Sequence, residues 1–338
     1  MSDYKNGTAG GSKAKRGHCK RFWWVYLLVL IVIIVIVVPC IILIAVPKMA
    51  QSKVNDAKLT IDGVAVTQTE AGSFNLAINS TITTDGSAHA TIAGFNGTMW
   101  LLDTDGPVAF TSIEFPETSS DAVVPVNISQ IVTIDHLDEL TTFNQRLLTN
   151  ETVNVRVNGS TTVRVSGIAR DYPITFSKDI AFAGFKSFAG INVTNPKVGL
   201  TQTKNFNATA IIPNPTLWSV DVGNTSFSTY FNNTKIGVTN ITNMVLQPGD
   251  NEFPIEGDIS QLVIVNALIQ QPYCSNGGVL PFAITGDSVV NNNESIPWLA
   301  NALSAFNVSL NIEIGAAVKS AGIPLSCADA TNSTKLRV

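Results

Sequence analysis

The sequence predicts a mainly β protein with one N-terminal transmembrane helix, followed by two tandem β-sandwich domains that each carry a short helix. Three observations support this fold class: an uncharged apolar run at residues 22–47, many short segments of alternating apolar and polar residues after it, and an internal repeat with a period of about 130 residues. Apolar residues make up 45% of the chain and charged residues 14%, which is typical of a chain that buries a core.

The apolar run FWWVYLLVLIVIIVIVVPCIILIAVP has no charged residue over its 26 positions. A helix of this length spans about 39 Å, and the hydrocarbon core of a bilayer is about 30 Å thick. Aromatic rings cluster at its first end, as is typical of a membrane interface. The alternative is a cleaved signal peptide. Its apolar region is about 7–15 residues long and ends in a small-residue cleavage pattern, and both features are missing here.

The charge distribution predicts the orientation of this helix. Residues 1–21 carry a net charge of +5, and the rest of the chain carries −9. The excess of basic residues before the span predicts a cytosolic N-terminus and a luminal C-terminus. The basic tail is interpreted either as this topology signal alone or as a contact for anionic lipids. The acidic remainder has no basic stripe for a phosphate backbone, so we expect no nucleic-acid partner.

Asparagine sequons test the predicted topology. Thirteen N-x-S/T sequons follow the span, at Asn79, Asn96, Asn127, Asn150, Asn158, Asn192, Asn207, Asn224, Asn232, Asn240, Asn293, Asn307 and Asn332. This number fits a glycoprotein of the secretory pathway. Asn6 also lies in a sequon, but the predicted topology places it in the cytosol, where it stays unmodified.

Four cysteines divide between the two predicted sides. Cys274 and Cys327 are the two that follow the span, so a disulfide between them is the natural pairing in an oxidising compartment. Cys19 lies next to the membrane and is interpreted either as an S-palmitoylation site or as an idle thiol. Cys40 lies within the span, where it acts as a small apolar residue.

Three short segments recur in the same order along the luminal part. TQT at 67–69 matches 201–203, FN at 74–75 matches 206–207, and ISQIV at 128–132 matches ISQLV at 259–263. A period of this length indicates tandem domains. The resulting division is a basic tail at 1–21, the span at 22–47, a stalk at 48–56, a first sandwich at 57–167, a linker at 168–182, a second sandwich at 183–318 and a C-terminal tail at 319–338.

Each copy is predicted to end with a helix and an alternating strand. Residues 135–148 place four apolar side chains on one helical face, with Asp135 as N-cap, and a strand follows at 153–157. In the second copy Pro297 opens a helix, and a strand follows at 308–314. The remaining luminal sequence consists of short β segments separated by turn residues, which favours β-sandwiches.

Motifs for enzymatic chemistry are missing from the sequence, and we expect no catalytic residue, metal site or cofactor. It has no G-x-S-x-G, P-loop, H-E-x-x-H or C-x-x-C motif. Only His89 and His136 could serve a luminal site. His136 lies beside acids at a helix start, and a single histidine such as His89 does not make a metal site.

The second copy resembles the water-stress (WHy-type) domain of late embryogenesis abundant group two proteins. The resemblance rests on Asn214-Pro215 after an alternating strand, on Gly223 and Gly237 in the following strands, and on the turn Pro248-Gly-Asp-Asn251. The whole arrangement is similar to a fungal family of uncharacterised single-pass membrane proteins. This resemblance implies sandwiches of seven or eight strands with a helix, a vacuolar or other endomembrane location, and a role in lipid handling or autophagy control. The first copy has Asn79-Ser80-Thr81 in place of Asn-Pro.

The leading hypothesis is therefore a non-enzymatic, membrane-tethered protein whose luminal sandwiches bind a ligand, with a lipid acyl chain in an apolar groove as its sharper form. The alternative is a glycosylated structural or adhesion protein with a packed interior. The internal volume of each sandwich distinguishes the two. The plasma membrane remains an alternative to the vacuolar or endomembrane location.

Overall fold

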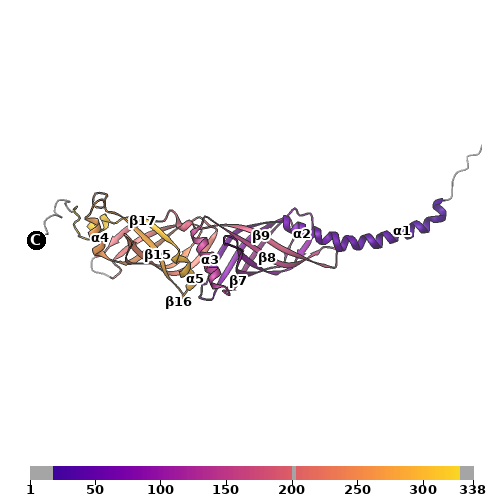
Figure 1. The fold of residues 1–338 in the computed structure, drawn as a ribbon, viewed down its shortest axis with the longest axis horizontal. Helices are drawn as coiled ribbons and strands as arrows, with labels where there is room; N and C mark the ends of the chain where they lie inside the picture. Colours follow the sequence, from indigo (N-terminus) through magenta and orange to yellow (C-terminus); the bar gives the residue numbers. More distant parts are fainter. Residues whose placement is uncertain (1–17, 200–202, 328–338) are drawn as a thin grey trace, which may run out of the picture. The chain divides into compact units, whose positions relative to one another are not determined.

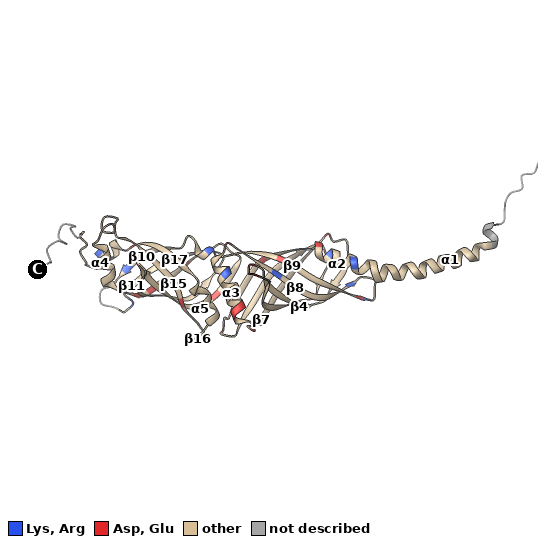
Figure 2. Ribbon diagram, viewed as in Figure 1, with Lys and Arg blue, Asp and Glu red and all other residues tan. Residues whose placement is uncertain are grey.

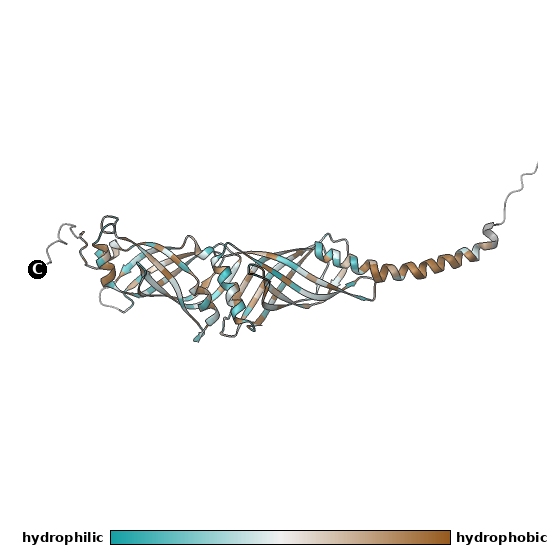
Figure 3. Ribbon diagram, in the orientation of Figure 1, coloured by the Kyte–Doolittle hydropathy of each residue, from teal (hydrophilic) through white to brown (hydrophobic). Residues whose placement is uncertain are grey.

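In the computed structural model, residues 18–199 and 203–327 are described, and the chain divides into two compact units, Met1–Ser52 and Lys53–Val338. One helix long and apolar enough to cross a membrane covers Phe22–Asp56. It lies within a continuous helical segment made of α1 (His18–Cys40), a π-helical turn (Ile41–Ala45) and α2 (Val46–Asp56). The side chains of residues 22–41 are all exposed, and Figure 3 shows most of α1 as hydrophobic. Such a surface needs an apolar solvent.

The helix continues through the residues predicted to form a stalk. Residues 48–56 belong to α2 and are helical to Asp56. The segment predicted as a stalk is therefore helical, because Lys, Met, Ala and Gln are good helix formers.

The second unit contains both copies of the repeat. Figure 1 shows the elements of the first copy, in indigo to magenta, and those of the second, in orange to yellow, at different ends of this unit. The first copy comprises β1 (Lys58–Thr67), β2 (Ser73–Thr83), β3 (Ala90–Ile92), β4 (Phe95–Leu101), β5 (Val108–Phe115), β6 (Thr118–Ser119), β7 (Val123–Thr133), α3 (Leu137–Thr149), β8 (Thr152–Val165) and β9 (Asp171–Ala183). After a 3-10 turn (Lys186–Phe188), the second copy comprises β10 (Asn192–Val198), β11 (Phe206–Asn214), β12 (Trp218–Phe231), β13 (Thr234–Leu246), β14 (Gly249–Ile259), α4 (Gln261–Leu268), β15 (Val279–Asn291), β16 (Glu294–Ser295), α5 (Pro297–Ser304), β17 (Asn307–Glu313) and α6 (Gly315–Ser320).

The strand order is the same in the two copies. In the second copy the strands form one run, β10-β11-β14-β13-β12-β15-β17. In the first copy β1-β2-β7 and β5-β4-β8-β9 follow the same order but fall into two separate sheets. The topology therefore makes β8 the counterpart of β15, β9 the counterpart of β17, and α3 the counterpart of α4. The sequence-based pairing of α3 and β8 with α5 and β17 is wrong, because similar apolar spacing occurs in helices at two different places in the chain.

This order also changes the boundary between the copies. Residues 168–182 were predicted as a linker, but β9 pairs with β8 along its length, from Thr152↔Ala183 to Arg164↔Asp171. This segment alternates apolar and polar residues as a strand with one buried face does, and Tyr172, Ile174 and Phe176 are buried. It is thus the last strand of the first copy.

The two copies share one sheet and a helical contact. β1 pairs in parallel with the start of β12, from Val64↔Trp218 to Val66↔Val220. α3 and α5 lie side by side, and Gln145 donates a hydrogen bond to the carbonyl of Asn301 at 3.2 Å. The Phe143 and Trp218 rings pack with centroids 6.1 Å apart. The first and second copies therefore share a continuous core.

Alternation along the strands produces that core. β14 alternates buried and exposed residues from Asn251 to Ile259, and Figure 3 shows mixed hydrophilic and hydrophobic positions along the strands. The predicted helices are confirmed as α3 and α5. The N-cap of α3 is His136 rather than Asp135, and Leu140, Phe143 and Leu147 form its buried face.

Candidate functional site

The sequon asparagines lie at the surface. Of the twelve described, nine are exposed and three are half-buried, namely Asn150, Asn207 and Asn240. Asn332 and Asn6 lie outside the described residues. By contrast, Asn214 and Asn251 belong to no sequon and are 2% and 9% exposed. Nine of the described sequon asparagines are therefore accessible at the surface of this unit, and glycosylation of the sequons stays a prediction.

The two buried asparagines explain the motif behind the family resemblance. Asn214 donates to the carbonyl of Trp218 at 2.8 Å and accepts from Thr216, so it closes the turn between β11 and β12. Asn251 donates to the carbonyls of Gln247 and Gly249 and accepts the Gln247 N–H at 2.9 Å. Both amides satisfy backbone groups that the strands leave unpaired. Their role is therefore structural.

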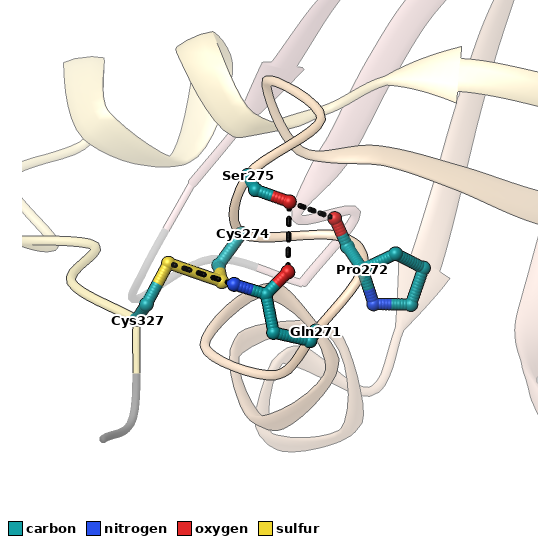
Figure 4. Close-up of a disulfide and its surroundings, with 5 residues drawn as sticks. All are labelled: Gln271, Pro272, Cys274, Ser275 and Cys327. Carbon is teal, nitrogen blue, oxygen red and sulfur yellow. Dashed lines mark hydrogen bonds between the residues drawn. A yellow bond between two sulfur atoms is a disulfide. The ribbon is translucent and has the colours of Figure 1, made fainter. Parts of the chain in front are cut away.

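A disulfide joins Cys274 to Cys327, with the two Cα atoms 5.4 Å apart. Figure 4 shows its surroundings, where Gln271 donates to Sγ of Cys327 and accepts a hydrogen bond from Ser275 at 2.7 Å. The bond ties the segment after α6 to the turn after α4. Cys40 is a free, exposed thiol in α1, and the side chain of Cys19 lies outside the described part of the chain.

Titratable side chains are dispersed over the surface. Figure 2 shows acidic and basic residues scattered along the strands. His89 is exposed and lies 4.0 Å from Asp121, whereas His136 stands at the start of α3. Within residues 18–199 and 203–327, no group of three or more His, Cys, Asp or Glu side chains is arranged to hold a metal ion.

The carboxylates with altered pKa values lie in exposed ion pairs. Arg156 contacts Asp179 at 2.6 Å and Arg164 contacts Asp171 at 2.6 Å across β8 and β9, and these hydrogen bonds lower the pKa of each aspartate. Hydrogen bonds from Lys53 and then Ser87 lower the pKa of Asp85 to about 2. Each perturbed carboxylate is explained by a surface partner and not by burial in a cleft.

Apolar cavities run through the interior of the second unit. The first cavity, of about 60 Å³, lies mainly in the first copy, and its lining includes Phe74, Phe110, Phe143, Trp218 and Leu299. The second cavity, of about 50 Å³, lies in the second copy between residues such as Phe206, Phe227, Met244, Phe282 and Phe306.

A middle cavity, also of about 50 Å³, shares lining residues with both of these cavities. It shares Asn144, Leu147, Val220 and Leu299 with the first cavity. It shares Phe188 and Met244 with the second cavity. The middle cavity is therefore a neighbour of the other two, and Met244, an unbranched and adaptable residue, is one of the two that line both the middle and the second cavity.

The two copies differ at one strand boundary. In the second copy β13 and β14 pair from Gly237↔Ile259 to Ile241↔Ile255. Their counterparts β5 and β7 lie next to each other but belong to different sheets. A hydrogen bond from the Glu114 N–H to the side-chain oxygen of Gln130, at 3.1 Å, connects them. We call this boundary between β5 and β7 the seam. It lacks the backbone pairing that joins β13 to β14, so it is the weaker of the two contacts.

Sequence reasoning found the alternating strands and missed the cavities. Alternation places apolar residues inside but does not fix the volume between them. Asn144 was the one available signal, since it is a polar residue next to the apolar face of a predicted helix.

Comparisons with known proteins identify one family of unknown function and solved structures of low similarity. A family described as a protein of unknown function (DUF3712) matches residues 108–229, from β5 to β12. No curated protein matches the chain. Among solved structures, a red sea bream transglutaminase is 13% identical with a TM-score of 0.22, and the match covers 79% of this chain and 33% of the transglutaminase. A Mobiluncus mulieris adhesin with intramolecular disulfide, isopeptide and ester cross-links is 12% identical with a TM-score of 0.19, covering 69% of this chain and 81% of the adhesin.

Proposed function

We propose that this protein is a non-enzymatic, single-pass membrane protein whose β unit, displayed on the luminal or extracellular side, binds an apolar ligand. The exposure of nine of the twelve described sequon asparagines and the disulfide after the span support this side of the membrane. The resemblance to WHy-type domains and to a fungal membrane-protein family supports a vacuolar or other endomembrane location.

The main support for an apolar ligand is the series of three apolar cavities. Their linings are almost entirely aliphatic and aromatic, and neighbouring cavities share side chains. Apolar cavities stay dry and accept apolar guests, as a cavity of about 150 Å³ in an engineered protein does for benzene. An acyl chain is the elongated apolar molecule that would suit such a series.

The volumes set a condition on this proposal. Ligand pockets usually measure about 300–1,000 Å³, several times the 50–60 Å³ found for each of the three cavities. A ligand must therefore displace the side chains that line two neighbouring cavities. Met244 is the most adaptable of these side chains. The small volumes favour the second candidate function, a glycosylated structural or adhesion module with a packed interior.

Lipid extraction and mass spectrometry on the purified full-length protein distinguish the two functions. The comparison is with the Leu299→Phe variant, which adds bulk where the first and middle cavities meet. We expect a lipid to co-purify with the native chain and to be reduced in the variant, provided that both unfold cooperatively. Equal lipid in both samples, at the level of empty detergent micelles, would support the structural module.

A further inference from the structure

Two buried hydrogen-bond donors beside the first cavity have no partner. Within the described residues, five buried side-chain polar atoms are unpaired, and two of them are Nδ2 of Asn144 and Nε1 of Trp218. Both residues line the first cavity, and Trp218 is only 7% exposed. An amide NH2 and an indole N–H can only donate, so both nitrogens need an acceptor. Buried polar groups in proteins are nearly always hydrogen-bonded, and these two are exceptions.

The second cavity does not share this property. Its polar lining residues are Thr229 and Thr239, whose hydroxyls lie 3.4 Å apart and pair with each other. The unpaired donors therefore distinguish the first cavity from the second.

The two donors come from different copies of the repeat. Asn144 lies on α3 of the first copy, and Trp218 opens β12 of the second. Phe182 packs edge-on against the Trp218 ring with centroids 5.4 Å apart, and Phe143 packs against it from α3. These contacts fix the indole plane, so the site is complete only when both copies are joined.

The lining also limits the charge of a ligand. No Lys, Arg or His belongs to the described lining of the first or the middle cavity. A carboxylate or phosphate buried there would have no cation, and burying an unpaired charge is strongly unfavourable. A neutral oxygen accepts from N–H groups without that penalty.

We infer that the first cavity binds a neutral amphipathic lipid, such as a long-chain alcohol, whose hydroxyl oxygen accepts hydrogen bonds from Asn144 and Trp218. The alkyl chain enters the middle cavity when Leu147 and Leu299, which line both cavities, move aside. This inference rests on the proposed function and adds the chemical class of the ligand. The competing explanation is a trapped water, for which a cavity of about 60 Å³ has room.

Equilibrium binding of radiolabelled 1-tetradecanol, tetradecane and ionised tetradecanoate to the full-length protein in nanodiscs tests the inference, with empty nanodiscs as background. We expect the alcohol to bind about tenfold more tightly than the alkane, as two neutral hydrogen bonds allow, and more tightly than the carboxylate. Asn144→Leu and Trp218→Phe should each reduce this preference and leave alkane binding nearly unchanged. The exposed Asn301→Leu change on α5 is the matched control and should preserve the preference.

Three results would overturn the inference. Equal binding of alcohol and alkane means that water satisfies the donors, and the apolar-ligand function then stands without this specificity. If both the Asn144→Leu and the Trp218→Phe variants still prefer the alcohol over the alkane, other residues recognise the hydroxyl group. Binding of none of the three probes above empty nanodiscs rejects the proposed function as well.

Discussion

At the scale of single residues, the second copy relies on side-chain amides where its strands leave backbone groups unpaired. Asn251 illustrates the arrangement, since its Nδ2 contacts the carbonyls of Ile212, Gln247 and Gly249 at 2.8 to 3.3 Å. The sequence alone showed a Pro-Gly-x-Asn turn but not that its asparagine is buried, because burial depends on β11 packing alongside.

Replacing Asn251 with Asp should destabilise the fold. A carboxylate cannot donate, and the oxygen that replaces Nδ2 would face three carbonyl oxygens. We expect the free energy of unfolding to fall by about 2–3 kcal/mol, measured by urea denaturation of the solubilised protein. Asn243→Asp, at an exposed position of β13, is the control and should stay close to the native value. Equal stability of the two variants would contradict the role assigned to Asn251.

The pH response of Asp85 is a second residue-scale prediction. Its hydrogen bonds to Lys53 and Ser87 lower its pKa from 3.8 to about 2. A folded-state pKa below the unfolded value means that the pair stabilises the fold above pH 3.8 and that this contribution is lost as the pH falls through about 2. The carboxyl ¹³C shift of Asp85 should titrate accordingly. The Lys53→Met change should raise the midpoint of the Asp85 titration towards 3.8, whereas the control change Lys235→Met should leave it in place. An unchanged midpoint in the Lys53→Met variant would show that Lys53 does not stabilise the Asp85 carboxylate.

At the scale of elements, the strands were largely predictable and their partners were not. The alternating segments at 153–157 and 308–314 are strands β8 and β17, as local pattern implies. Residues 168–182 alternate as well, but their position between two copies favoured a linker. The motif at 128–132 is strand, whereas its match at 259–263 passes from β14 into α4. Similar residues thus adopt different structures because tertiary context overrides local preference.

The seam between β5 and β7 gives an element-scale prediction. β14 forms backbone hydrogen bonds to β13, whereas β7 meets β5 through the side chain of Gln130. Amides of β7 that do not bond to β2 should therefore exchange with solvent at least about tenfold faster than the matching amides of β14. Hydrogen–deuterium exchange with mass spectrometry measures this difference. Equal protection in the two copies would show that the seam is closed.

At the scale of the whole molecule, the repeat and the apolar helix were evident from the sequence. The shared core was not, since it depends on parallel pairing of β1 with β12 and on contact of α3 with α5, which join residues about 150 positions apart. The first and middle cavities lie at this junction, and for the same reason sequence reasoning could not locate them.

Both candidate functions require the β unit to lie across the membrane from residues 1–21. Glycopeptide mass spectrometry of the full-length protein, expressed in a eukaryotic cell and recovered from its membranes, tests this placement most directly. We expect N-glycans on exposed sequons such as Asn96, Asn158 and Asn224, and an unmodified Asn6. A glycan on Asn6, with every sequon after the span unmodified, would contradict it.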